Sequence, residues 1–414
     1  MKINKLKFTL LLITGLWTQA MTQNVDFVAI SSGEKLKLGF VQNSGELSDS
    51  VVAIISRDLT LPGMVEIFTH PEKPSPFWQN DGMVNYITYT IIKDKENLLN
   101  IKLQLKQVGS DLILMTDSAK IKKSEFRKYL HSYSNKLTNQ FFAINGSALS
   151  KITFVTNRTG HKEIALMDYD GVNQRVLTNH KSISSFPSIS PDFSNIYYSS
   201  FLKGYPSLFV YNLKVNKYRA LLAPGLQAYG PKVSNLGHHL LFTLQEKGNV
   251  DVYRMRLSDR KIYRVSALSS GETSPAWGLG DQEIFFTSDR GGKPQIYRMD
   301  IYGSGMERIT FTGAYNESAT LSPNGQLLAF CRMIGGQMKI LIKNLITGDE
   351  MLLNKGFGNY ESPSWSPDGK MITFSSDRTG SSQVYLIRID GTGMFRLTTR
   401  GKNTSPSWST SGQK

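Results

Sequence analysis

The side chains that could act in catalysis or hold a metal are few and widely spaced. The 414-residue chain has one cysteine and six histidines, which are Cys331, His70, His131, His161, His180, His238 and His239. None of the histidines has a second ligand at the spacing of a zinc finger or a helical metal site. Cys331 follows Phe330 in a strand-like pattern, so we expect a buried, unreactive thiol. The sequence therefore predicts no metal site and no cofactor.

Carboxylates offer a second route to chemistry, because a pair of them can hydrolyse or eliminate a sugar. The spacing of the acidic residues selects no such pair, and the chain has no G-x-S-x-G nucleophile motif. We expect a binding protein with no catalytic residues. Two alternatives stay open: an exported propeller hydrolase or lyase, and a generic exported ligand-binding propeller.

A repeat of 44 positions fills the last two-thirds of the chain and contains Cys331 and four of the six histidines. Two columns fix the period: Gly160, Gly204, Gly248, Gly292, Gly336 and Gly380, and Pro187, Pro231, Pro275, Ala319 and Pro363. A period of 40 to 50 residues is typical of a propeller or a solenoid. Turns such as Ser366-Pro367-Asp368-Gly369 separate four short strands in each copy. This pattern favours a mainly β fold with a six-bladed propeller.

Apolar columns run through all six copies and predict the core. The second strand of each copy has an aromatic residue at Phe154, Tyr198, Phe242, Phe286, Phe330 and Phe374. The first copy lacks its own first strand, whereas residues 404–410 form a first strand with nothing after it. We predict that this C-terminal strand pairs with Ile152–Val155 and closes the ring, which removes the open sheet edges.

The segment before the repeat predicts two further parts. Residues 1–20 have a basic start, an apolar run and a small residue at the end, as a secretory signal peptide does. We expect a small α/β domain over residues 21–148 and the propeller over residues 149–414. In the α/β domain, apolar residues recur every four positions over 47–59, and a second helix is expected from Ser124 as its N-cap. The loop 70–82 is expected to be a surface connection.

The net charge of the chain is +15, which often indicates an anionic partner. Export argues against nucleic acid. The densest basic run, residues 120–128, is expected to form the solvated start of a helix.

The whole arrangement resembles a known family. A signal peptide, an α/β domain containing AIISRDLTLPGMVEIF, and six copies related to SPDGKMITFSSDRTGSSQVY resemble the TolB family of the Tol-Pal envelope system. The resemblance implies a periplasmic protein that binds the peptidoglycan-associated lipoprotein Pal at the propeller mouth. It also implies contact with TolA through the N-terminal segment, and a role in outer-membrane integrity and constriction at cell division. A monomer is expected because the closed ring leaves no obvious unpaired edge.

The resemblance also implies which residues meet the partner. The positions that match the family's binding site are Gln227, Tyr229, Thr273, Ser274, Glu317 and Glu361. In a propeller, the loop before the first strand and the loop between the second and third strands open on the same face. That face adds Asp289 and Arg290, while Tyr360 is an expected aromatic anchor. The Asp289-Arg290 pair could instead stabilise its own loop.

Overall fold

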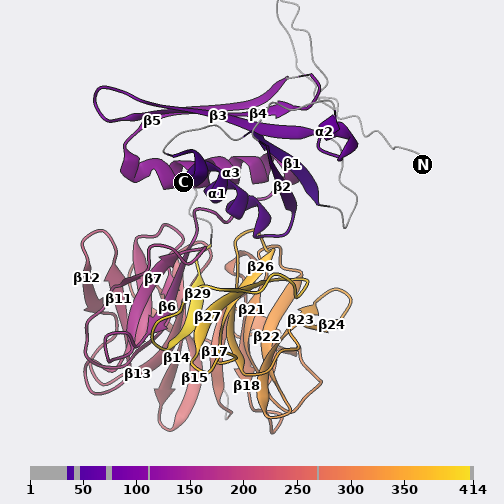
Figure 1. Cartoon of the computed structure of the whole chain (residues 1–414). Coiled ribbons are helices and arrows are strands. Elements are labelled where there is room, and N and C mark those ends of the chain that lie inside the picture. The colour runs from indigo at the N-terminus through magenta and orange to yellow at the C-terminus, as the bar shows by residue number, and fades with distance from the viewer. Residues whose placement is uncertain (1–34, 42–46, 71–76, 111, 268–269, 411–414) are drawn as a thin grey trace, which may run out of the picture. The chain divides into compact units, whose positions relative to one another are not determined.

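The structure is a computed structural model that describes residues 35–41, 47–70, 77–110, 112–267 and 270–410 (Figure 1). The predicted signal peptide and residues 21–26 lie outside the described residues. Residues 35–414 form one unit, so the expected boundary at residue 148 stays a prediction.

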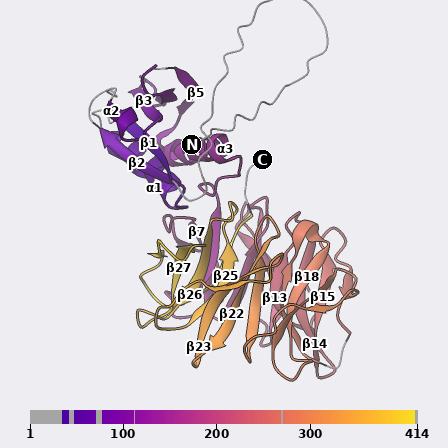
Figure 2. The ribbon, with the colours of Figure 1, turned by 90° about the vertical axis from the view of Figure 1, so that its right-hand side faces the viewer.

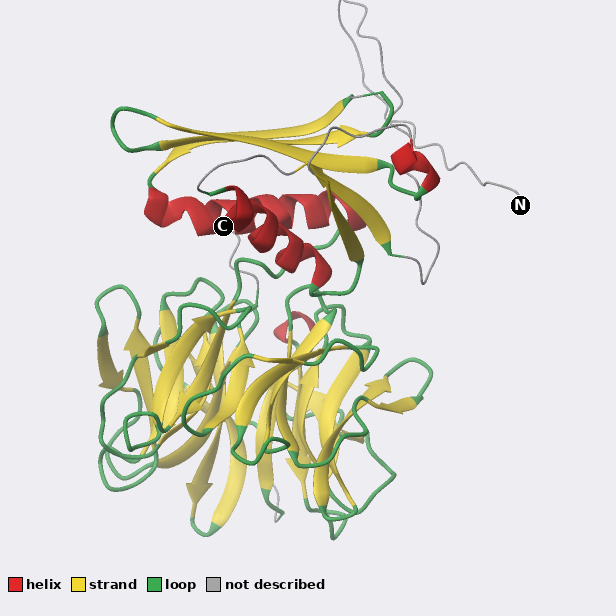
Figure 3. Ribbon diagram, viewed as in Figure 1, coloured by secondary structure: helices red, strands yellow, loops and turns green. Residues whose placement is uncertain are grey.

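The first part of the chain is a five-stranded mixed sheet whose two longer helices cover one face (Figure 3). The strand order is β2-β1-β3-β4-β5, and β1 is parallel to both of its neighbours. The strands are β1 (Leu36–Val41), β2 (Val65–His70), β3 (Asn85–Lys93), β4 (Leu99–Gln107) and β5 (Ile113–Ile121). The helices are α1 (Ser48–Thr60), α2 (Phe77–Asn80) and α3 (Phe126–Phe142), and the turn η1 (Lys123–Glu125) precedes α3.

The apolar stripe predicted over residues 47–59 is confirmed. Val51, Ile55 and Leu59 of α1 are buried at intervals of four residues. Helix α3 is also confirmed, but its start is not. Ser124 lies inside η1 and Glu125 is the N-cap, so the predicted cap at Ser124 is wrong.

Two surface predictions hold only in part, although Lys122, Lys123 and Lys128 are exposed at the start of the second helix as expected. The second half of the loop 70–82 contains α2, whose Trp78 is buried edge-on against Tyr86. Lys120, at the start of the basic run, belongs to strand β5, where it pairs with Asp94 at 2.8 Å. Further along the run, Arg127 is half-buried and binds Asp170 at 2.6 Å. In both cases the deciding contacts join different elements, because Trp78 of α2 packs on β3 and Arg127 of α3 binds a residue that follows β7.

Six four-stranded antiparallel sheets follow, and each is one blade (Figures 1 and 2). Blade one combines β29 (Asn403–Trp408), β6 (Lys151–Thr156), β7 (Glu163–Asp168) and β8 (Arg175–Val176). Blade two has β9 (Ser184–Ile189), β10 (Asn195–Ser200), β11 (Ser207–Asn212) and β12 (Lys217–Ala220). Blade three has β13 (Gln227–Val233), β14 (His239–Glu246), β15 (Asn249–Arg256) and β16 (Ile262–Arg264).

The remaining blades repeat the same order of strands. Blade four has β17 (Glu272–Trp277), β18 (Glu283–Ser288), β19 (Gln295–Asp300) and β20 (Glu307–Arg308), with the turn η2 (Leu279–Asp281) after β17. Blade five has β21 (Asn316–Leu321), β22 (Leu327–Ile334), β23 (Gln337–Asn344) and β24 (Glu350–Leu352). Blade six has β25 (Tyr360–Trp365), β26 (Met371–Ser376), β27 (Gln383–Arg388) and β28 (Phe395–Arg396). The predicted six-bladed propeller with a preceding α/β region is confirmed.

The predicted ring closure is also confirmed. Strand β29 pairs antiparallel with β6, and Trp408 lies opposite Ile152. The Trp408 indole donates a 2.7 Å hydrogen bond to Ser150 Oγ, and its backbone N–H donates to Ser364 Oγ of blade six at 2.9 Å. The C-terminal strand thus joins the two ends of the ring.

The predicted aromatic column forms the core between the blades. All six members, from Phe154 to Phe374, are at most 1% exposed. Cys331 is buried beside this column as expected, and burial raises the pKa of its thiol.

Every innermost strand carries a β-bulge at the same place, which the sequence pattern did not predict. At each bulge one residue has a positive φ of 49° to 59°, at Phe186, Gly230, Ser274, Ser318, Ser362 and Ser405. Proline or alanine follows each of these residues, and proline suits a bulge because it donates no ladder hydrogen bond. The bulges set where the channel-lining side chains of the six strands point.

Candidate partner-binding site

The register of the strands places the predicted binding residues at one end of the propeller. Glu272 at the start of β17 pairs with Ser288 at the end of β18, directly before Asp289. In blade six, Tyr360 at the start of β25 likewise pairs with Ser376 at the end of β26. The loops that lead into the innermost strands therefore lie beside the loops after the second strands. We call this end of the propeller the mouth.

Six predicted residues lie at the starts of innermost strands, on the mouth side. Gln227, Thr273 and Glu361 are exposed, whereas Tyr229, Ser274 and Glu317 are half-buried. Tyr229, Thr273 and Ser274 line the channel that leads inward from the mouth. The residues come from blades three to six, so a partner that contacts all of them must cover four blades.

Tyr360 does not belong to this surface. Its side chain is completely buried and packs against Phe374, with ring centroids 5.5 Å apart. The Lys339 ammonium lies 5.1 Å from the centre of its ring. A buried ring cannot anchor a partner, so the prediction for Tyr360 is wrong.

Asp289 and Arg290 are held by their own blade. The Asp289 carboxylate accepts a 3.0 Å hydrogen bond from the backbone N–H of Gly271. The Arg290 guanidinium binds Glu272 at 3.3 Å and lies 4.8 Å from the centre of the Tyr297 ring. These contacts stabilise the loop and orient both side chains. These contacts directly support the alternative that Asp289 and Arg290 stabilise their own loop.

The electrostatics of the mouth centre on Glu317 and Glu361. Burial raises the pKa of Glu361, and the nearby carboxylates of Glu317 and Asp377 raise it further, while Lys402 offsets part of this rise. Glu317 accepts a 2.8 Å hydrogen bond from the Tyr315 hydroxyl. Burial and Glu317 together raise the pKa of Tyr315 to about 12. The free protein thus holds two like charges close together at an open surface.

We expect Glu361→Gln to stabilise the protein at pH 7. Folding raises the pKa of this carboxyl, so its ionised form is less stable in the folded protein than in the unfolded chain. Below the unfolded pKa, near 4.3, the carboxyl is neutral in both states and costs no stability. As pH rises through the folded pKa, ionisation lowers the stability of the fold. Glutamine cannot ionise, so the variant does not lose this stability at pH 7. The difference in free energy of unfolding between variant and wild type should therefore shrink as pH falls from 7 towards 4. The gain should stay below about 1 kcal/mol because the side chain is exposed. Urea unfolding at several pH values measures it, and a benefit that grows at low pH would contradict the reasoning.

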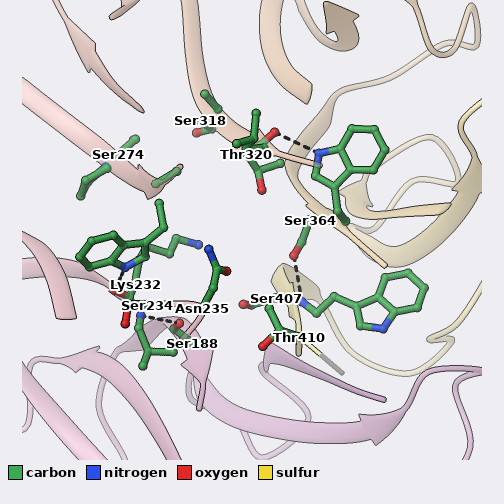
Figure 4. A pocket seen from close by; sticks show the side chains of 18 of the residues that line it. Ser188, Lys232, Ser234, Asn235, Ser274, Ser318, Thr320, Ser364, Ser407 and Thr410 are labelled. Atoms are coloured by element: carbon green, nitrogen blue, oxygen red, sulfur yellow. Dashed lines mark hydrogen bonds between the residues drawn. The ribbon is translucent and has the colours of Figure 1, made fainter. Parts of the chain in front are cut away.

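A channel leads from the mouth along the innermost strands and has a cavity volume of about 860 Å³ (Figure 4). Serine, threonine and proline side chains dominate its wall, and its one charged wall residue among the described positions is Lys232. The motifs in the sequence did not single out this lysine. The signal was available, because Lys232 directly follows the proline column, where the other copies have Ser188, Ala276, Thr320, Ser364 and Ser407.

Buried carboxylates elsewhere in the propeller have structural partners. Glu163 accepts a 2.5 Å hydrogen bond from the Thr178 hydroxyl, whose oxygen accepts the backbone N–H of Ile164 at 2.9 Å. Asp251 is held in the same way by Ser266 and also pairs with Arg264 at 2.6 Å. These carboxylates bind the segment that ends the fourth strand of a blade to the third strand. Among the described residues, no group of His, Cys, Asp and Glu is arranged to hold a metal ion.

Comparisons with known proteins agree with this architecture. A protein from Chlorobium luteolum named "Protein TolB homolog" is 30% identical over 184 residues, which are 44% of this chain and only 42% of that protein. The "Tol-Pal system protein TolB" of Francisella tularensis subsp. holarctica is 29% identical over 310 residues, 69% of each chain. In the part of the chain that the structure describes, no helix combines the length and apolarity needed to cross a membrane.

The fold is matched by a solved structure. TolB from Acinetobacter baumannii superposes with a TM-score of 0.78 at 24% identity, over 91% of this chain and 97% of that one. The family model described as "TolB beta propeller domain" matches residues 135–412. Because that match covers well over half of the sequence, the chain belongs to the TolB beta propeller domain family.

Proposed function

We propose that this chain is the periplasmic TolB component of a Tol-Pal envelope system and that it binds a Pal-like lipoprotein at the propeller mouth. Through this contact it supports outer-membrane integrity and constriction at cell division. The family match and the relatives named for the Tol-Pal system support the proposal. A TolA-like protein is the second partner, through the N-terminal segment.

The observation that carries the partner-binding proposal is the acidic pair at the mouth. Glu361 is exposed, yet its ionised form is disfavoured by partial burial and by Glu317. A basic group from a partner would relieve this repulsion and gain a charge-assisted hydrogen bond. The proposed contact residues are Gln227, Tyr229, Thr273, Ser274, Glu317 and Glu361, with Asp289 and Arg290 at the rim.

The proposed role is non-enzymatic. The buried carboxylates Glu163 and Asp251 already have structural partners, and the channel wall offers hydroxyls and one lysine. In the described part of the chain, this set contains no activated nucleophile held by a base.

Reversing both charges of the pair tests the proposal. Titration calorimetry of the mature protein with the soluble domain of Pal from the same organism should show saturable one-to-one binding. Glu317→Lys combined with Glu361→Lys should weaken that binding at least about tenfold, because each attractive contact becomes a repulsive one. A thermal melt of the double variant shows whether it is folded.

A matched control separates this effect from the change in net charge. Glu96→Lys with Glu307→Lys alters the charge equally, and both side chains form exposed ion pairs of little energetic weight. The control should bind Pal normally. If wild type fails to bind Pal, the proposed function is wrong. If the mouth variant binds as well as the control, the site is elsewhere.

A further inference from the structure

The channel wall contains a column of six equivalent positions, one from each blade. They are Ser188, Lys232, Ala276, Thr320, Ser364 and Ser407, and all six line the cavity. Five are small and uncharged, whereas Lys232 places an ammonium group among them. Figure 4 shows the Lys232 side chain directed into the opening that the serine and threonine residues surround. The sixfold pattern is broken at one position by a charge.

This charge has no counterion within the described part of the chain. The lining of the cavity includes no Asp or Glu side chain. Nor do the described residues form an ion pair or hydrogen bond with the Lys232 ammonium. Burial lowers the pKa of Lys232, with no opposing contribution from a carboxylate. Partial burial disfavours an uncompensated cation, so an anion that pairs with the Lys232 ammonium would stabilise its charged form.

Two serine hydroxyl groups in the same column can donate hydrogen bonds to a ligand. Ser188 Oγ accepts the backbone N–H of Val233 at 3.0 Å, and Ser364 Oγ accepts the backbone N–H of Trp408 at 2.9 Å. An oxygen that accepts a bond still has its own hydrogen to donate. These inter-blade bonds also fix where both oxygens lie. The wall therefore combines one ammonium group with pre-positioned O–H donors, the chemistry that recognises an oxyanion.

The backbone around Lys232 is held firmly. Its carbonyl oxygen accepts a 2.8 Å hydrogen bond from the Trp277 indole, which links blade three to blade four. Thr320 is held in the same way by Trp365 at 3.0 Å. Because the strands that carry the donors are tied together, little backbone conformational entropy is lost when a ligand binds.

We propose that the propeller channel binds a small oxyanion, a carboxylate or a phosphate, through the ammonium group of Lys232 and the hydroxyls of the same column. The cavity of about 860 Å³ is large enough for a small molecule that carries the anion. This site lies inside the channel and is separate from the acidic pair at the mouth. It does not depend on the proposed Pal contact.

Titration calorimetry at constant ionic strength tests the site with two probes, inorganic phosphate and succinate. At least one should bind the full mature chain saturably with one-to-one stoichiometry. Lys232→Met should weaken that binding about tenfold or more, because a hydrogen bond from a charged donor is lost. Lys214→Met, which removes an exposed lysine of blade two, should leave it unchanged. Binding of phosphate alone or of succinate alone identifies the preferred class of anion.

A second measurement follows Lys232 in the wild-type protein and needs the variant only to assign its resonance. Reductive methylation with ¹³C-formaldehyde labels the lysines, and the resonance missing in Lys232→Met assigns Lys232. Its pKa in wild type should rise when the bound anion pairs with it. The proposal is overturned if neither probe binds wild type, or if the bound probe leaves both the Lys232 pKa and the affinity of Lys232→Met unchanged.

Discussion

Deleting residues 404–414 will leave a chain whose propeller has no cooperative unfolding transition. Strand β29 supplies the innermost strand of blade one, and its loss exposes the whole edge of β6. Trp408 is buried among Ile152, Phe154 and residues of blade six. Loss of one buried tryptophan side chain costs about 3–5 kcal/mol, and a typical domain is stable by only about 5–15 kcal/mol. Removal of the complete strand should exceed this margin.

Circular dichroism during heating and urea unfolding would measure the effect. A chain that lacks only residues 411–414, which follow β29, is the matched control and should melt as wild type does. A truncated protein that melts at the wild-type temperature with the same cooperativity would show that β29 does not hold the ring closed.

The second large effect is expected from Asp58→Ala. Asp58 of α1 accepts a 2.5 Å hydrogen bond from the Tyr169 hydroxyl and lies 2.7 Å from Nδ1 of His131 in α3. All three side chains are at most 5% exposed. Alanine leaves both partners buried and unsatisfied, so we expect a loss of about 3–5 kcal/mol.

Urea unfolding quantifies the loss, and calorimetry shows whether the transition splits in two. Tyr169 belongs to the turn after β7, so the network ties the helices of the first part to the propeller. Asp58→Asn keeps an acceptor for Tyr169 and should lose clearly less stability. Glu66→Ala changes an exposed carboxylate and serves as the control. Equal stability of Asp58→Ala and the control would refute the role of the network.

The sequence could predict the features that recur in every copy of the 44-residue repeat. Because the period aligns six copies, it showed which positions form the core, and Phe242 and Phe286 are indeed completely buried. It also predicted that residues 404–410 complete the first blade. The period could not show the bulges, because Phe186, Gly230 and Ser274 share a backbone conformation and not a residue type. The network of Asp58, His131 and Tyr169 joins residues up to 111 positions apart, and no local pattern encodes it.

Tyr360 was wrongly predicted as a contact residue and Lys232 of the channel was not singled out, each for its own reason. Tyr360 precedes the exposed Glu361 in an alternating strand, and alternation does not say which face packs between blades. Lys232 occupies a position that is small in every other copy. A column whose members are mostly alike is easily taken as structural, and the one member that differs is then overlooked.

Ring closure has a consequence for how the protein folds. Lys151 and Ser409, which the closing strand brings together, lie 258 positions apart. Pairing over such a distance requires the closure of a very long loop, which slows folding. Before β29 of the same chain has paired with β6, the free edge of β6 can equally well pair with β29 of another molecule. The rate of closure relative to molecular encounter then decides between a closed monomer and a strand-swapped oligomer. Protein concentration during refolding is therefore the variable that sets which of the two products accumulates.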